Sequence, residues 1–224
     1  MQPMETNESP GSGRDAGNQR GVRASSHPAI LETRAWVRRA VIGLNLCPFA
    51  KAPEARDRVR YVVSDATSPS ALLHALADEL TQLMAVDETE IETTLLIHPW
   101  VLSDFIAFND FLEDVDDLVA GMKLEGIVQV ASFHPAYRFA GTAPGDPGNA
   151  TNRSPHPILH LLRESSVARA VEAFPDAAAI FATNIETMEG LGAEGWAALQ
   201  AACRADAEDG TDPGTHAGRR ESVV

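Results

Sequence analysis

Two short apolar segments of this chain end in the same dipeptide, His-Pro. The first segment is Thr93–Ile97, followed by His98-Pro99. The second is Ile127–Phe133, followed by His134-Pro135. Short continuous apolar runs that stop at such breakers are typical of strands buried on both faces of a sheet. The chain is therefore expected to build a sheet whose faces are covered by helices.

Strand and helix signals alternate along the chain. The β-branched, alternating segment Val59–Val63 predicts a first strand. Ser68-Pro69 predicts the start of a helix, because serine caps helices and proline suits their first turn. Phe105 to Met122 predicts another helix with one apolar face. This order predicts an α/β fold with a small three- or four-stranded, mostly parallel sheet and flanking helices. The alternative is a ferredoxin-like α+β sandwich with one strand reversed.

Further elements follow from local signals. Apolar residues at helical spacing from Ile30 to Leu44 predict an amphipathic helix. Ser154-Pro155 predicts a helix that runs to about Phe174, and Thr183-x-x-Glu186 predicts a capping box at the start of the last helix. The segment 136–153 is rich in Gly, Pro, Asn and Thr. A loop of this length inside a domain is usually functional or disordered.

Both ends of the chain are polar and lack periodic apolar residues. Such segments bury too little apolar surface to offset the entropy of ordering. We therefore predict disordered tails at residues 1–28 and 204–224, around a single α/β domain at residues 29–203.

Charge and composition exclude several classes of function. The formal net charge is -14, and an acidic surface without a basic stripe repels phosphate backbones, so nucleic-acid binding is not expected. No apolar run is long enough to span a bilayer, and the N-terminal residues lack the apolar core of a signal peptide. No membrane association and a cytoplasmic location are therefore expected. The two cysteines, Cys47 and Cys203, form no disulfide framework, as in a reducing compartment.

His98 and His134 are the strongest candidates for chemistry. If the strands are parallel, both leave the sheet at its carboxyl edge, where open α/β sheets place their ligands. There we expect them to act as general base and acid, or as neutral ligands of a divalent metal such as zinc. The alternative is that each His-Pro is only a strand stop with a hydrogen-bonded imidazole.

Cys47 is the candidate nucleophile or third metal ligand. A thiol at a helix C-terminus is not activated by the helix, so a nucleophilic role needs His98 or His134 beside it. One alternative is a buried thiol that packs as a small hydrophobe. Another is a thiolate contact to haem, because Cys-Pro next to apolar residues also occurs at such contacts.

An anion site is predicted at the helix expected from Ser154-Pro155. Asn152 and Arg153 precede it, so an amide, a guanidinium and free backbone N–H groups could face one small anion. Ordinary capping beside a surface arginine is the alternative. Tyr137, in the preceding loop, is the third predicted substrate-binding residue. His156 and His160 have a spacing that can offer two imidazoles to one metal, but Pro157 removes the glutamate that zinc proteases carry there.

Acidic side chains cluster between Asp110 and Asp117. They occupy the polar face of a predicted helix and lack the glycine-punctuated loop of a calcium site, which favours a solvated face. A basic protein partner for this face is the alternative.

Three motifs carry a family resemblance. They are Asn-Leu-Cys-Pro-Phe-Ala-Lys at 45–51, Ala-Ser-Phe-His-Pro at 131–135 and Thr-Asn-Arg-Ser-Pro at 151–155. With their neighbouring stretches, over about residues 32–196, they resemble a bacterial family catalogued as domain of unknown function 1415. The resemblance implies tyrosine as the usual residue where Ala150 and His156 stand here. It leaves a matching set of residues: Cys47, His98, His134, Asn152 and Arg153. It implies no activity.

These observations lead to one leading hypothesis. We expect a cytosolic small-molecule enzyme whose Cys/His pocket, with or without a metal, lies at the carboxyl edge of the sheet and binds an anionic ligand. The loop from Tyr137 to Arg153 is expected to roof that pocket. The alternatives are a non-catalytic metal- or haem-binding module and an acidic protein-interaction domain.

Overall fold

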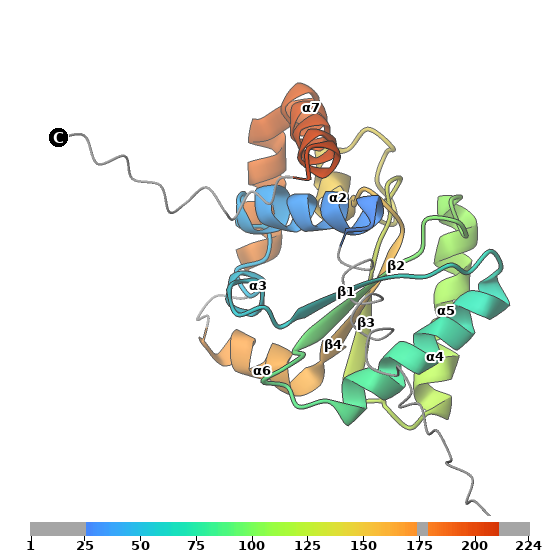
Figure 1. Ribbon diagram of the computed structural model, residues 1–224. Coiled ribbons are helices and arrows are strands. Elements are labelled where there is room, and N and C mark those ends of the chain that lie inside the picture. Colours follow the sequence, from blue (N-terminus) through green and yellow to red (C-terminus); the bar gives the residue numbers. More distant parts are fainter. Residues whose placement is uncertain (1–25, 174–178, 211–224) are drawn as a thin grey trace, which may run out of the picture.

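A four-stranded sheet with the strand order β1-β2-β4-β3 lies at the centre of the structure (Figure 1). The computed structural model describes residues 26–173 and 179–210. The parts of the predicted tails at 1–25 and 211–224 lie outside these residues. The strands are β1 (Val59–Val63), β2 (Thr93–Ile97), β3 (Val128–Phe133) and β4 (Ile158–Arg163). The predicted strands at 59–63, 93–97 and 127–133 are thereby confirmed to within one residue.

The sheet is mixed, so the prediction of a mostly parallel sheet is wrong. Among the described strands, β1 and β2 pair in parallel, whereas β4 is antiparallel to both β2 and β3. The chain returns after β3 and inserts β4 between two strands that run in the same direction. Ile97 and Phe133 both pair with Ile158. His98 and His134 therefore leave the sheet at one edge, as the repeated His-Pro predicted.

The segment after Ser154 does not begin a helix, so the helix predicted from Ser154-Pro155 is wrong at its start. Pro155 and Pro157 have no N–H to donate. The segment Ile158–Arg163 pairs along its whole length with β3, and all of it but Arg163 also pairs with β2. The helix predicted to reach about Phe174 is confined to α6 (Glu164–Ala173) within the described residues. A six-residue segment with four apolar residues fits both helix and strand patterns, and here the gap between β2 and β3 selects the strand.

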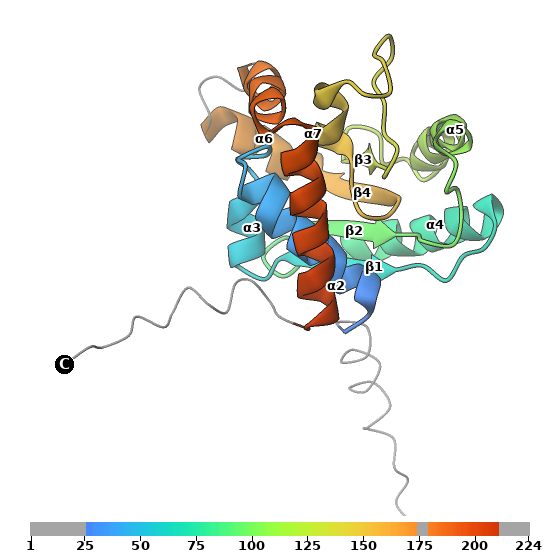
Figure 2. The ribbon, with the colours of Figure 1, turned by 90° about the horizontal axis from the view of Figure 1, so that it is seen from above.

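The helices lie on both sides of the sheet (Figures 1 and 2). Besides α6, they are α2 (Pro28–Trp36), the π-helical segment η1 (Val37–Ile42), α3 (Lys51–Ala55), α4 (Pro69–Ala85), α5 (Phe105–Gly121), the 3-10 helix η2 (Pro147–Asn152) and α7 (Ala179–Glu208). The Ser68 hydroxyl accepts a hydrogen bond from the Ala71 N–H, which confirms the predicted cap of α4. One strand is reversed, as the ferredoxin-like alternative required, but helices cover both faces.

Two apolar cores form, one on each face of the sheet. α4 and α5 pack on the first face, together with Leu96, Leu159 and Leu161. α2, η1 and α7 pack on the second face, together with Leu95 and Ile97. Successive residues of a strand point to opposite faces, so the continuous apolar run of β2 supplies both cores. α7 packs along α2 (Figure 2).

The C-terminal helix differs from its prediction. Thr183 lies inside α7, four residues after its start at Ala179, so Thr183 and Glu186 form no capping box. A left-handed Gly192, with φ of 66°, kinks the helix. Cys203 is buried, and α7 continues to Glu208, beyond the boundary at 203 that composition suggested.

The polar face of α5 is solvated, as expected. Asp110, Glu113, Asp114, Asp116 and Asp117 are all exposed. None of the helices within residues 26–173 and 179–210 has the length and apolar character needed to cross a membrane.

Arg163 joins the sheet to the end of α4. Its guanidinium, at the last position of β4, donates hydrogen bonds to the carbonyls of Leu83, Val86 and Ile91. Leu83 belongs to the last turn of α4, where carbonyls lack helical partners. One side chain thus satisfies several acceptors between α4 and β2.

We predict that Arg163→Met lowers the free energy of unfolding by about 2–4 kcal/mol, because it leaves these carbonyls without their donor. Urea denaturation measures the change. Arg169→Met is the matched control, because Arg169 forms a surface ion pair with Glu88 and its side chain is 52% exposed. The control should lose less than about 1 kcal/mol. Equal small losses in both variants would contradict the role assigned to Arg163.

Candidate functional site

His98 is a buried, neutral imidazole rather than an accessible base. It is 0% exposed, and its Nδ1 lies 3.1 Å from the Val101 carbonyl oxygen, so Nδ1–H donates to that carbonyl. The ring stacks on Phe108 at a centroid distance of 5.6 Å. Burial lowers the pKa of His98 to about 4. Its Nε2 has no hydrogen-bond partner among the described residues.

His134 uses both of its ring nitrogens within the protein. Nδ1 accepts a hydrogen bond of 3.0 Å from the Ala136 N–H, so the proton lies on Nε2 and is donated to the Leu102 carbonyl at 3.2 Å. This ring also stacks on Phe108, at 5.1 Å. Burial lowers the pKa of His134 as well. The two histidines share an edge of the sheet, as predicted, and they hold the segment that leads into α5.

The expected zinc site gains no support from this geometry. Within the described residues, no three side chains of His, Cys, Asp or Glu are grouped in a way that could hold a metal ion. Cys47 lies against the core on the face of α2 and η1, whereas Phe108, which stacks on both histidines, belongs to the core of α4 and α5. The predicted Cys47, His98 and His134 constellation is therefore divided between the two faces of the sheet.

The predicted anion anchors organise the loop after β3. Arg153 donates from Nε to the Tyr137 carbonyl at 3.2 Å and from Nη2 to the Pro144 carbonyl at 2.7 Å. Asn152 donates from Nδ2 to the Ser132 carbonyl at 3.4 Å. No helix begins at Ser154, so the helix N-terminus invoked for the anion is absent from this place.

Tyr137 belongs to an aromatic group. Its ring packs against Phe105 and Phe139, with centroid distances of 5.3 and 5.0 Å. The side chain of Ser132 interacts with its hydroxyl. Tyr137 thus ties the loop to β3 and to the start of α5.

Asn149 is the residue that shapes this loop, and sequence reasoning missed it. It is fully buried. Its Oδ1 accepts hydrogen bonds from the Phe139 N–H and the Thr142 hydroxyl, and its Nδ2 donates to the Ala143 carbonyl. A loop with such an internal network is a folded part of the domain and not an open lid.

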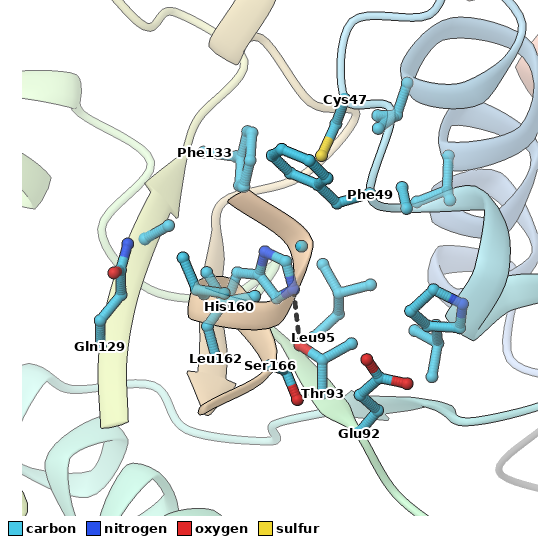
Figure 3. Close-up of a pocket in the computed structure, with 18 of the residues that line it drawn as sticks. Cys47, Phe49, Glu92, Thr93, Leu95, Gln129, Phe133, His160, Leu162 and Ser166 are labelled. Atoms are coloured by element: carbon cyan, nitrogen blue, oxygen red, sulfur yellow. Dashed lines mark hydrogen bonds between the residues drawn. The ribbon is translucent and has the colours of Figure 1, made fainter. Parts of the chain in front are cut away.

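A cavity of about 330 Å³ opens on the second face of the sheet, between the strands, η1 and α6 (Figure 3). Val59 and Thr93, the first residues of β1 and β2, contribute to its wall. It therefore lies toward the edge opposite to His98 and His134, in contrast to the expected position. Its walls are mainly apolar and aromatic, and they include Trp36, Val37, Val41, Phe49, Leu95, Phe133 and Leu162.

His160 is the polar centre of this cavity. Its Nε2 lies 2.7 Å from the Thr93 hydroxyl, and that hydroxyl donates its proton to the Leu161 carbonyl at 2.6 Å. A hydroxyl has only one proton to donate, so the His160 Nε2 must carry the proton of the first bond. Nδ1 is then an unprotonated acceptor, and Figure 3 shows it on the side of the ring that faces Cys47 and Phe133. Burial lowers the pKa of His160 to about 4, so the ring stays neutral at neutral pH.

The Cys47 thiol lines the opposite part of the same cavity (Figure 3). The turn that carries it follows η1, and the Leu46 carbonyl is held by the Asn184 side chain of α7 at 2.7 Å. Burial raises the pKa of the thiol, and the N–H groups of Phe49 and Ala50 oppose that shift only in part. Cys47 is therefore a neutral thiol in the free protein, whereas a haem contact would need a thiolate.

The cavity has little to offer an anion. Glu92 is the charged side chain in its wall, and it lies 3.9 Å from Arg58. An anionic ligand would meet apolar groups and a carboxylate there.

His156 and His160 do not form the pair that their spacing suggested. His156 precedes β4, and its Nε2 lies 3.1 Å from a carboxylate oxygen of Glu32. His160 lies within β4 and bonds to Thr93. The helix that would have placed both imidazoles on one face is absent.

The chain belongs to the family described as Protein of unknown function (DUF1415), whose model matches residues 28–198. This confirms the resemblance carried by the three motifs. Comparison with curated proteins and with solved structures finds no match. The description of the family names no activity.

We predict that His98→Asn flattens the dependence of stability on pH. Because the folded pKa of about 4 lies below the usual 6.5, the unfolded chain takes up the proton first as the pH falls. Stability is then lost between about pH 6.5 and 4, with a slope of up to about 1.4 kcal/mol per pH unit. Asparagine retains a donor for the Val101 carbonyl and does not titrate. Urea titrations between pH 4.5 and 7.5 measure both slopes, and parallel curves would contradict the assignment.

Proposed function

We propose that the protein takes up a small, uncharged, largely apolar molecule in the cavity over its sheet, where Cys47 and His160 are the groups able to act on it. One observation carries this proposal. The Nδ1 acceptor of His160, held unprotonated through Thr93, faces an apolar cavity of about 330 Å³. A few oriented polar groups in an otherwise apolar pocket are what small-molecule sites usually contain.

The walls define the class of ligand. The wall contains the aromatic side chains of Trp36, Phe49 and Phe133. These favour a ligand with a ring system. The carboxylate of Glu92 disfavours a negative charge. Nδ1 of His160 needs a donor, because a buried acceptor without a partner is costly. The ligand that fits these features is a neutral ring compound with one hydroxyl or N–H group.

The thiol gives this site a reaction to perform. If the ligand carries an electrophilic carbonyl carbon, the Cys47 sulfur can form a bond to that carbon while the carbonyl electron pair moves to oxygen. The thiol proton passes by way of Nδ1 of His160 to that oxygen, so the product is a neutral hemithioacetal. Thr93 orients the imidazole through Nε2, as the third group of a nucleophile and base pair does. Both groups are neutral in the free protein, so the step begins with a neutral thiol and a neutral imidazole.

We predict that 1-naphthol binds about fivefold more tightly than naphthalene, because its hydroxyl can donate to Nδ1 of His160. His160→Gln places an amide donor near the Nε2 position and should lose this preference while keeping the bond to Thr93. His160→Asn places an acceptor near the Nδ1 position and should keep part of it. Fluorescence titration measures the affinities.

Two controls locate the ligand. Ala131→Phe fills the cavity from β3 and should weaken both compounds, because Ala131 lines the wall. Bound naphthol should slow the labelling of Cys47 by N-ethylmaleimide. A wild-type protein that binds neither compound, or an unchanged preference in His160→Gln, would refute the proposal.

A further inference from the structure

A second cavity, of about 180 Å³, lies where α2, the loop after β3 and α7 meet. Its wall includes Glu32 and Trp36 from α2, Arg153 from the loop, and Trp196 and Arg204 from α7. Trp36 also lines the first cavity, so its indole forms part of the partition between the two. Unlike the first cavity, this one contains two arginines.

Arg153 carries a positive charge without a carboxylate partner. Within the described residues, the salt bridges of arginine involve Arg38, Arg39, Arg58, Arg60 and Arg169. Arg153 is not among them, although the chain has a net charge of -14. Its bonds go to two neutral carbonyls, and burial lowers its pKa, so no carboxylate among the described residues balances its charge.

Arg204 brings a second unpaired guanidinium to the same cavity. It is exposed on α7 and forms no salt bridge within residues 26–173 and 179–210. Glu32, the carboxylate in the wall, is bonded to His156 Nε2 at 3.1 Å and to neither arginine. The charged side chains of the wall are thus two arginines and one carboxylate, which together give one net positive charge. Guanidiniums bind carboxylates through charge-assisted hydrogen bonds.

We infer that this second cavity binds a small organic carboxylate, with its carboxylate group between Arg153 and Arg204 and its apolar body against Trp36 and Trp196. The volume equals that of about six water molecules, at about 30 Å³ each, which suits one small ring or a short chain. The two indoles favour an organic acid over inorganic phosphate, because phosphate has no apolar part to place against them. This site is separate from the cavity of Cys47 and His160, and it does not depend on the function proposed there.

The test is calorimetric titration of the full-length protein with benzoate. Benzamide has nearly the same shape and no charge, and we expect it to bind at least about fivefold more weakly than benzoate. Arg204→Gln should weaken benzoate about five- to tenfold, as expected when a charged hydrogen-bond donor is lost. Arg56→Gln is the matched control, because Arg56 is exposed, lies outside the cavity and changes the net charge equally.

Arg204 is chosen for substitution because Arg153 also holds its own loop together. Equal thermal unfolding temperatures of the two variants would show that both are folded. Benzoate binding that falls in Arg204→Gln and not in Arg56→Gln supports the inference. Three results overturn it: equal affinity for benzoate and benzamide, unchanged affinity in Arg204→Gln, or binding of inorganic phosphate without binding of benzoate.

Discussion

The pairing of β4 with β2 and β3 is the interaction on which the arrangement of this molecule depends. β4 enters the sheet antiparallel between two strands that run in the same direction. In that position His160 pairs with Leu95 on one side and with Ala131 on the other. Its ring then lies within hydrogen-bond distance of the Thr93 hydroxyl. It also carries the end of β4 to the edge where β1 and β2 begin, so that α6 follows beside the cavity. One reversed strand thus creates both the polar centre and part of the wall of the candidate site.

The two edges of the sheet have different roles in this account. At the edge where β2 and β3 end, His98 and His134 donate to the carbonyls of Val101 and Leu102 and stack on Phe108. These hydrogen bonds hold the segment that leads from β2 into α5. Toward the other edge, the imidazole of His160 is held by one nitrogen and leaves the other for a ligand. The two histidines that follow β2 and β3 thus bond to the segment before α5, whereas His160 faces the cavity.

Much of the fold could be predicted because local signals and tertiary pairing agree. The β-branched run at Val59–Val63, the apolar run at Thr93–Ile97 and the Ser68 cap each point to the element that forms. The segment Ile158–Arg163 contains no local signal that distinguishes a helix from a strand, since its pattern fits both. Only the gap between β2 and β3, which is not local in the sequence, selects a strand. His160 was missed for the same reason. In a helix, His160 would lie on the same face as His156, whereas in the strand it bonds to Thr93.

The shared edge of His98 and His134 could be predicted from the two His-Pro dipeptides, whereas their bonding could not. The hydrogen bonds of the two histidines depend on how the chain turns between β2 and α5. The sequence of that segment contains no repeating pattern. The position of Cys47 depends in turn on how η1 and α3 pack over the sheet. Such contacts join residues far apart in the chain, and a single sequence contains no direct signal for them.

The protonation state of His160 is the quantity that tests the central claim most directly. Nitrogen-15 NMR of the imidazole rings reports which nitrogen carries the proton and at which pH the ring titrates. The account predicts that His160 carries its proton on Nε2 and stays neutral to below pH 5, in agreement with a pKa of about 4. A ring that carries its proton on Nδ1 would contradict it, because Nδ1 would then offer no lone pair to the cavity. A ring that titrates near the ordinary value of about 6.5 would also contradict it, because the imidazole would then not be buried as the account requires.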